Sequence, residues 1–400
     1  MDFIFFSDID WTDPRRYPVH HVVERLAQEH RVFFVDNFGG VRDLRLGDLK
    51  RGFDKVKTAL QRRSGDGEPV RETPKNVKVY QPLILPTPRF PNTIGRLNGY
   101  LIARGVRRLM QEHNVERPVV WTRVETQIAW SAIRRIEPEM LVYQVVDNFP
   151  YNPIIPDSLR DRHAKYAKQF SRSADLIFAS ARGLKDKKEP LNDDVHFFPN
   201  GVEVDKFHQS SADEPGSLAG VPTPRLGFVG TVAPPVDFAT IETVAQRKPE
   251  WSIVFIGPTT QFARLRDLKR LDNVYFLGPV DHDDLPAYCQ SLDLGLIPYE
   301  LTEFTEYTFP SKLAEYLASG LPVLSSNIPE MIHYENVIGI YRDPDSFIRA
   351  AGEQMAKDAQ SEIAKRQNIA QSLSWASIVD RMTETIQERL SARGHHTHAV

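Results

Sequence analysis

The feature that most constrains this chain is a series of short apolar segments that alternate with helical segments and restart in the second half. In the second half these segments are RLGFVGTV, WSIVFIG, NVYFLGPV, LDLGLIPY and LPVLSS, beginning at residues 225, 251, 273, 292 and 321. Each has the length of a strand and is almost continuously apolar, which is typical of strands buried on both faces of a parallel sheet. A comparable series begins at Phe3–Phe6 and continues with RVFFVDN at 31–37. The sequence therefore predicts an α/β fold of two Rossmann-like, doubly wound domains facing across a cleft.

The position of the restart predicts the domain boundaries. A chain of 400 residues is long enough for two domains of about 150–200 residues. We expect a first domain over 1–208, a linker over 209–224 rich in Ser, Gly, Pro, Ala and Asp, and a second domain over 225–374. Residues 375–400 are expected to form an amphipathic helix that crosses back to the first domain, and a tail. The polar segment 41–75 is interpreted as an irregular insertion.

Composition excludes several classes of protein. The 50 Lys and Arg residues are balanced by 53 Asp and Glu, so we expect no nucleic-acid partner. The single Cys289 excludes an internal disulfide framework and a cysteine-based zinc site, and it suits the cytoplasm. The N-terminal MDFIFFSDID lacks the basic region of a signal peptide, and no apolar run approaches the ~20 residues of a membrane-spanning helix. Neither a dehydrogenase glycine motif nor a P-loop is present.

The sequence also predicts no metal and no cofactor. Asp8-Ile-Asp10 matches a metal-binding Asp-x-Asp motif only by its letters. His20 and His21 are adjacent, so on a helix they point in different directions and make a poor pair of ligands. The HHTH sequence near the C-terminus is expected to lie in a disordered end.

The most specific segment is FPSKLAEYLASGLPVL at residues 309–324. Pro310 and Ser311 suit a helix start, with Ser311 as the N-cap, and Lys312 and Glu315 then lie on one face of the helix. The amides and the positive dipole end of such a helix, together with the Lys312 ammonium, suit a diphosphate. Glu315 could accept hydrogen bonds from ribose hydroxyls. The alternative is an ordinary helix–strand unit with a surface ion pair.

This segment resembles the nucleotide-sugar motif of glycosyltransferases of the group 1/family 4 type, which have the GT-B fold. Pro-Asn-Gly-Val at 199–202, with Asp205 and Phe207, resembles their interdomain stretch. Residues 228–231 resemble the first strand and glycine turn of the donor domain, and 273–299 resemble the segment that contacts the base. The resemblance implies a metal-independent transferase that binds a UDP- or GDP-type sugar donor through Gly230, Thr231, Val280, Ser311, Lys312 and Glu315.

The segment departs from the family pattern in two places. Tyr307 stands where many retaining relatives carry the first glutamate of their Glu-x7-Glu motif. The Arg/Lys pair that often follows the first donor-domain strand is replaced by Val-Ala-Pro-Pro-Val-Asp at 232–237, so neutralisation of phosphate charge depends more heavily on Lys312. The missing glutamate favours an inverting reaction.

The first half resembles a narrower set, the xanthan-type glucuronosyltransferases and the teichuronic-acid-type transferases. The resemblance is carried by Ser7-Asp8, residues 13–16, His20-His21 and residues 141–147. It implies that Asp147 is the general base that takes a proton from the acceptor hydroxyl. The alternative for Asp147 is a turn or capping residue. The residues expected to bind the acceptor are Asp8, Asp10, Arg15, Arg16, His20, Arg123 and Glu125. For each of these, the alternative is a solvated, capping or structural side chain.

The predicted partners are a nucleotide-sugar donor and a glycan, lipid-linked or small-molecule acceptor in polysaccharide biosynthesis. From Arg42 to Arg108 there are 16 Lys or Arg residues against 6 Asp or Glu. This excess is either a solvated face or a patch for an anionic membrane surface or lipid diphosphate. The second possibility places the protein in the cytoplasm at the inner face of the membrane.

Two other functions stay open. A sugar-nucleotide 2-epimerase would share the fold and the donor site but need no acceptor. A non-catalytic protein that binds sugar nucleotides or glycans is compatible with the missing first glutamate, although Lys312 and Glu315 favour an enzyme.

Overall fold

The computed structural model describes residues 1–13, 15–36, 72–82, 84–85, 92–153, 155–208, 214–261, 264–357 and 360–397. Most of the insertion predicted at 41–75 lies outside the described residues, and so does much of the basic segment 42–108. Residues 209–213 of the predicted linker also lie outside them.

Within the described part of the first half, seven strands form one parallel sheet in the order β3-β2-β1-β4-β5-β6-β7. The strands are β1 (Asp2–Phe6), β2 (Arg31–Val35), β3 (Val77–Tyr80), β4 (Val119–Thr122), β5 (Met140–Val145), β6 (Leu176–Ala179) and β7 (Val195–Phe197). The helices of this half are α1 (Pro18–Leu26), α3 (Asn92–Glu112), α4 (Gln127–Ile136), α5 (Asp157–Ser173) and α6 (Arg182–Lys188), with short 3-10 turns η1 (Phe149–Tyr151) and η2 (Glu189–Leu191).

The second half repeats this plan with a parallel sheet of six described strands, in the order β10-β9-β8-β11-β12-β13. The strands are β8 (Arg225–Val229), β9 (Ser252–Ile256), β10 (Val274–Gly278), β11 (Leu294–Ile297), β12 (Val323–Ser326) and β13 (Gly339–Tyr341). The helices are α7 (Val204–His208), α8 (Phe238–Arg247), α9 (Leu265–Leu268), α10 (Leu285–Gln290), α11 (Ser311–Ala318), α12 (Pro329–Ile332), α13 (Pro344–Met355), α14 (Gln360–Ser372) and α15 (Trp375–Thr397), with η3 (Gly216–Leu218) and η4 (Thr305–Tyr307). The prediction of two Rossmann-like halves is confirmed.

Both faces of each sheet are covered, which explains why the strands are apolar throughout. In β1, Ile4 and Phe6 enter the layer formed with α3 and α4, whereas Phe3 and Phe5 enter the layer formed with α1 and α15. In β8 the same alternation sends Val229 toward the layer of α10 and α11 and Leu226 toward α8 and α13. Successive side chains of a strand point to opposite faces, so a doubly covered strand needs apolar residues at every position.

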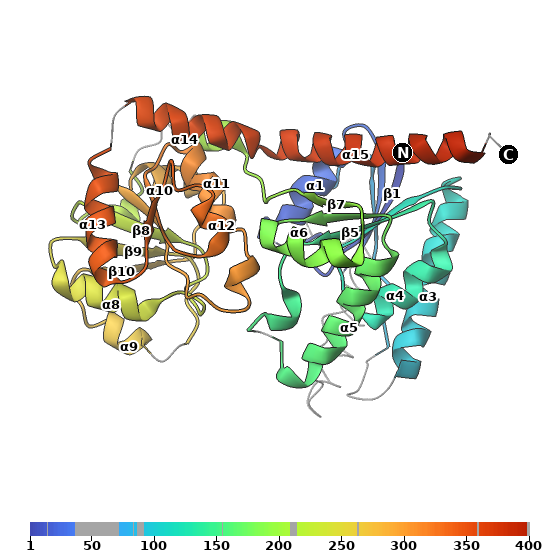
Figure 1. Cartoon of the computed structure of the whole chain (residues 1–400), viewed down its shortest axis with the longest axis horizontal. Helices are drawn as coiled ribbons and strands as arrows, with labels where there is room; N and C mark the ends of the chain where they lie inside the picture. Colours follow the sequence, from blue (N-terminus) through green and yellow to red (C-terminus); the bar gives the residue numbers. More distant parts are fainter. Residues whose placement is uncertain are drawn as a thin grey trace.

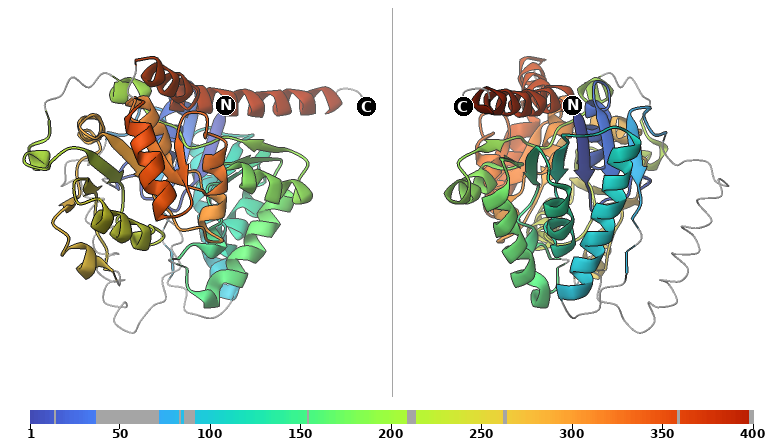
Figure 2. Two further views of the ribbon diagram at one scale, coloured as in Figure 1. Left: turned by 60° about the vertical axis from the view of Figure 1, so that its left-hand side comes forward. Right: turned by 90° about the vertical axis from the view of Figure 1, so that its right-hand side faces the viewer.

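Helix α15 joins the C-terminal end of the chain to the first half. Figure 1 shows it running along the first half, and both views of Figure 2 agree. Its buried side chains, among them Ile378 and Met382, share a core with Phe3 and Phe5 of β1. Where it begins, Val202 of the interdomain segment donates a backbone hydrogen bond to Leu373 at 2.9 Å. The two chain segments that pass between the halves therefore lie side by side.

The strand orders locate the places where a ligand would be expected. In the first sheet the chain reverses its direction of growth between β1 and β4, and in the second sheet between β8 and β11. Loops that follow neighbouring strands diverge at such a switch point and leave room at the carboxyl edge. The residues that follow β1, β4, β8 and β11 are thus the first candidates for a site.

Candidate active site

Asp147 lies where the two halves of the chain come together. It follows β5, which is the strand next to β4 at the first switch point. Burial is the largest influence on this carboxyl and raises its pKa to about 7. The Arg123 charge and a hydrogen bond with the Thr308 side chain lower the pKa, whereas the carboxylates of Asp8 and Glu125 raise it. Thr308 belongs to the second half, so both halves set the protonation of Asp147. A carboxyl with this pKa can exchange a proton near neutral pH.

Asp8 and Arg123 lie beside Asp147, as the order of their strands requires. Asp8 follows β1, Arg123 follows β4, and the Arg123 Nε lies 3.0 Å from the Asp8 Oδ1. The Arg123 side chain is largely buried, so its charge is poorly screened by water. The structure therefore places a fixed cation and an anion next to the candidate base.

Glu125 is the most deeply buried acid of this group. The Tyr143 hydroxyl donates a hydrogen bond to its Oε1, and its Oε2 has no hydrogen-bond partner among the described residues. Burial raises the pKa of Glu125, while the nearby Lys188 charge lowers it. A buried oxygen without a partner is costly and is often satisfied by water or a ligand. Glu125 is thus suited to accept a hydrogen bond from a hydroxyl that enters beside Asp147.

Four of the predicted acceptor residues lie around the start of α1 rather than at Asp147. Arg15 is exposed and pairs with Asp13 at 3.0 Å, and Arg16 pairs with Glu24 at 2.5 Å. The Asp10 carbonyl lies 3.2 Å from the His20 Nε2.

His20 itself is fully buried. Its Nδ1 accepts a hydrogen bond from the Tyr17 backbone amide, which forms part of the cap of α1. Both ring nitrogens of His20 therefore make contacts within the chain. The structure supports a capping role for His20 in place of the predicted binding of the acceptor substrate.

On the second half, Lys312 reaches over the switch point from α11. Its Nζ donates a hydrogen bond to the Tyr299 hydroxyl and lies 4.9 Å from the ring centroid of Phe228. Phe228 is in β8 and Tyr299 follows β11, so the ammonium sits where these strands diverge. A Cβ added to Gly230 would lie 3.5 Å from the Lys312 Cε. The contact with Tyr299 was not predicted, although Tyr299 closes the LDLGLIPY strand.

The start of α11 differs from the prediction in one detail. The helix begins at Ser311, with Pro310 in the N-cap position, so Ser311 is not the cap. No side-chain cap bond is made to this end by any described residue. The Pro310 side chain has no oxygen that could cap the helix, and among the described residues its carbonyl accepts only from the Leu313 amide, at 3.0 Å. The Ser311 and Lys312 amides therefore keep the donor capacity that an anion requires.

Glu315 lies one turn further along α11 and is half-buried. Burial raises its pKa, and the charges of Lys312 and Lys206 lower it. Lys206 is in α7, in the segment that joins the halves, and sequence reasoning did not single it out. Lys206 and Glu315 are more than 100 residues apart along the chain, so the sequence gives no sign that the lysine charge acts on Glu315.

The remaining donor-site candidates line the carboxyl edge of the second sheet. Gly230 and Gly257 have φ of +138° and +143°, and a Cβ on Gly257 would lie 2.1 Å from the Gly230 carbonyl oxygen. The loops after β8 and β9 therefore pack backbone against backbone, which only glycine permits. Thr231 is exposed beside them, and Val280 is half-buried in the loop after β10.

Further contacts hold the two carboxyl edges together. The Asn148 side chain donates to the Glu303 carbonyl at 2.7 Å and accepts from the Lys187 Nζ at 3.2 Å. The same lysine lies 4.4 Å from the ring centroid of Tyr307. Tyr307, which replaces the glutamate of retaining relatives, thus packs against α6 of the first half.

Known proteins resemble this chain in sequence. Residues 223–357 match the family model described as Glycosyl transferases group 1. The Bacillus subtilis protein TuaH, named as a teichuronic acid biosynthesis glycosyltransferase, is 34% identical over 191 residues, which are 45% of this chain and 48% of the relative. The matched region therefore spans about half the length of that protein. The predicted resemblance to group 1 glycosyltransferases and to teichuronic-acid-type transferases is confirmed.

Solved structures share the arrangement of the whole chain. The Anabaena protein HepE in complex with UDP has a TM-score of 0.65 at 15% identity, covering 97% of this chain and 100% of that chain. Sucrose-phosphate synthase from Thermosynechococcus elongatus has a TM-score of 0.70 at 14% identity, covering 98% and 100%. At such identities the likeness concerns the fold, and the predicted GT-B fold is confirmed.

The raised pKa of Asp147 predicts a stability that depends on pH. Between about pH 4 and about pH 7 the folded chain keeps a proton on Asp147 that the unfolded chain has lost, so stability falls as pH rises through this window. Asp147→Asn removes the charge and should unfold at a higher temperature than the wild type at pH 8. That advantage should shrink toward pH 4.

Thermal unfolding followed by circular dichroism at a series of pH values measures this effect. Asp157→Asn, at an exposed carboxyl, is the matched control and should show no such trend. A difference between Asp147→Asn and the wild type that is the same at every pH contradicts the assignment.

Proposed function

We propose that this chain transfers a sugar from a UDP- or GDP-type nucleotide-sugar to a hydroxyl of a glycan, lipid-linked or small-molecule acceptor. The observation that carries the proposal is that Asp147 is a carboxyl with a raised pKa beside the Asp8–Arg123 pair. Thr308 of the other half also affects this pKa, and Lys312 lies at the switch point of that half. A proton acceptor and a phosphate-binding cation thus belong to one site built from both halves. The match of residues 223–357 to group 1 glycosyltransferases supports the same chemistry.

The second half is proposed to bind the donor. The Lys312 ammonium and the first amides of α11 would contact the diphosphate, and the backbone at Gly230 and Thr231 would approach it closely. Glu315 would accept from the ribose, and the loop at Val280 would contact the base. The structures of HepE were determined with UDP and with UDP-glucose, which supports a uridine donor here.

The reaction would follow from these positions. Asp147 takes the proton of the acceptor hydroxyl while that oxygen bonds to the anomeric carbon of the sugar. The bond from this carbon to the nucleotide diphosphate breaks, and the electron pair leaves with the diphosphate. The Lys312 ammonium and the helix amides stabilise the developing negative charge, a role that a metal ion fills in other enzymes. We therefore propose that transfer needs no metal.

The stereochemical outcome is proposed to be inversion. Attack by an oxygen activated at Asp147, opposite the diphosphate, inverts the anomeric carbon in one displacement. Tyr307 occupies the position of the first glutamate of retaining relatives and packs against Lys187. The position of Tyr307 therefore provides no carboxylate that could contact the donor.

Removal of Lys312 should abolish tight donor binding. Lys312→Ala loses a charged contact to phosphate, so UDP should bind about 10–100-fold more weakly. Calorimetric titration of UDP, GDP, ADP and dTDP, with EDTA present, measures this loss and identifies the base.

Lys365→Ala, at an exposed lysine of the same half, should bind like the wild type. If none of the four nucleotides binds the wild type, a non-catalytic function becomes the better interpretation.

Asp147→Asn should lose transfer but keep donor affinity, because a carboxamide cannot accept the proton. Turnover should fall by about 10²–10⁴-fold. In the wild type, kcat/KM should rise with pH through about 7 as Asp147 ionises. Thr308→Val removes a hydrogen bond that lowers this pKa and should move the profile to higher pH. Transfer by Asp147→Asn at the wild-type rate would exclude Asp147 as the base.

We also propose peripheral contact with a membrane through α3, most of which lies in the basic segment 42–108 predicted from sequence. Leu97 and Tyr100 are 45% and 48% exposed, although both are large and apolar. They share the outer face of α3 with exposed arginines at 96, 104, 107 and 108. Exposed apolar groups ringed by arginine suit the headgroup region of an anionic bilayer. None of the helices in the described ranges is long and apolar enough to span a membrane.

Reversal of charge on this face should weaken binding to vesicles. Each arginine near an anionic surface contributes about 1 kcal/mol, so Arg104→Glu with Arg107→Glu should reduce the partition coefficient by about tenfold or more. Co-sedimentation with phosphatidylcholine vesicles, with and without phosphatidylserine, measures it. Arg270→Glu with Arg349→Glu, on the second half, is the matched control. Equal loss of vesicle binding in both double variants would exclude α3 as the membrane contact.

A further inference from the structure

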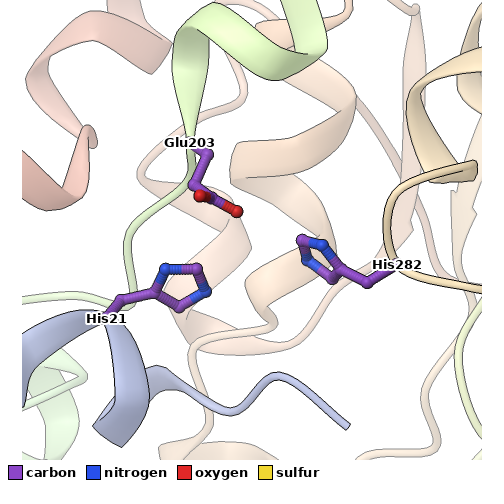
Figure 3. A group of neighbouring side chains, drawn as sticks. All are labelled: His21, Glu203 and His282. Carbon is purple, nitrogen blue, oxygen red and sulfur yellow. The ribbon is translucent and has the colours of Figure 1, made fainter. Parts of the chain in front are cut away.

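Three side chains from three separate parts of the chain converge at the junction of the two halves (Figure 3). His21 lies on α1, Glu203 directly precedes α7, and His282 lies in the loop between β10 and α10. One ligating atom from each lies within 4.8 Å of those of the other two. The proposed function uses none of these residues.

The surroundings restrict each of the three side chains. The His21 ring is buried and stacks on Trp375, with ring centroids 5.2 Å apart and planes 8° from parallel. Burial, and after it the charge of Lys206, lowers the pKa of His282. The Glu203 Oε2 is buried and has no hydrogen-bond partner among the described residues.

We propose that His21, Glu203 and His282 bind a transition-metal ion of the Zn²⁺ class. Two imidazole nitrogens and one carboxylate oxygen form a ligand set that Zn²⁺ accepts in proteins, with a fourth position left for water. Bonds of about 2.0–2.2 Å to a central ion require the ligand atoms to approach one another by roughly 1 Å from the upper limit seen here. Small rotations of the Glu203 and His282 side chains supply this approach. None of these three ligands takes part in the proposed transfer reaction.

Two cations compete with the metal. The Lys206 Nζ lies 3.0 Å from the His282 Nδ1 and 4.0 Å from the Glu203 Oε2, and it also contacts the exposed Asp283 carboxylate. The Arg16 guanidinium lies 3.6 Å from the Glu203 Oε1. The lysine ammonium therefore already approaches the position of a cation. A bound ion would have to displace it from His282, so removal of Lys206 should strengthen metal binding.

The position of the ligands gives the ion a structural consequence. His21 belongs to the first half, Glu203 to the connecting segment and His282 to the second half. An ion held by all three would fix the angle between the halves. Because it binds only the assembled junction, it would also raise the unfolding temperature.

The test uses Co²⁺ alone as a spectroscopic probe, followed by displacement with Zn²⁺ alone. The histidines of the C-terminal HHTH sequence could bind metal themselves, so the reference protein is the full chain with His395, His396 and His398 replaced by alanine. We expect one Co²⁺ per chain, with the intense visible absorption of four-coordinate cobalt, and a rise in unfolding temperature. His282→Gln and Glu203→Gln should each weaken binding by about tenfold or more, and Lys206→Met should strengthen it.

Circular dichroism shows whether each variant is folded. His21→Ala can fail this test because its ring packs in the core, but Glu203 and His282 are partly exposed and keep the proposal open to refutation. Metal binding that disappears with the C-terminal histidines overturns the proposal. So does binding in the reference protein that survives His282→Gln combined with Glu203→Gln.

Discussion

The Arg182–Glu330 ion pair joins the two halves, and the candidate site draws residues from both of them. Arg182 begins α6 in the first half, and Glu330 lies in α12 of the second. Both the backbone amide and the guanidinium of Arg182 donate to the Glu330 carboxylate, at 2.8 and 2.5 Å. Glu330 is only 2% exposed, and burial raises its pKa. Such a carboxylate is costly to bury unless its partners stay in place, so the pair restricts the relative position of the halves more than it adds stability.

That arrangement explains why the environment of Asp147 had to come from the tertiary structure. The sequence places Asp147 after a buried strand, which identifies a candidate and its sheet edge. The neighbours that set its pKa, Arg123 and Thr308, come from a loop in the same half and a loop in the other. Neither relationship leaves a spacing signal in the sequence. Resemblance therefore proposed the residue and a role as general base, which stays a prediction, whereas its electrostatics required the packed junction.

The outcome of other predictions also depended on whether the feature leaves a pattern in the local sequence. Strand-length apolar runs and their restart were sufficient for the fold, because burial on both faces requires a pattern that is local along the chain. The first turn of α11 was also local, and Lys312 lies where the motif predicts. Ser311 was misassigned because a serine after proline resembles a cap by type, although Pro310 occupies that position. His20 was misassigned because its ring closes a local cap on Tyr17, which no charge or hydrophobic pattern reveals.

Lys206 connects the two sites at the junction. Its charge lowers the pKa of Glu315 on the proposed donor side, while its ammonium contacts His282 and Asp283 on the other. One cation thus contacts His282 and Asp283 and also influences the more distant Glu315 through its charge. A divalent ion that displaced Lys206 from His282 would bring more positive charge to the junction than the lysine carries, which favours the ionised form of Glu315. A protonated Glu315 accepts hydrogen bonds from a ribose less strongly than a carboxylate does. The position of this lysine therefore provides an electrostatic route by which occupancy of the junction can alter affinity for the donor, without movement of α11.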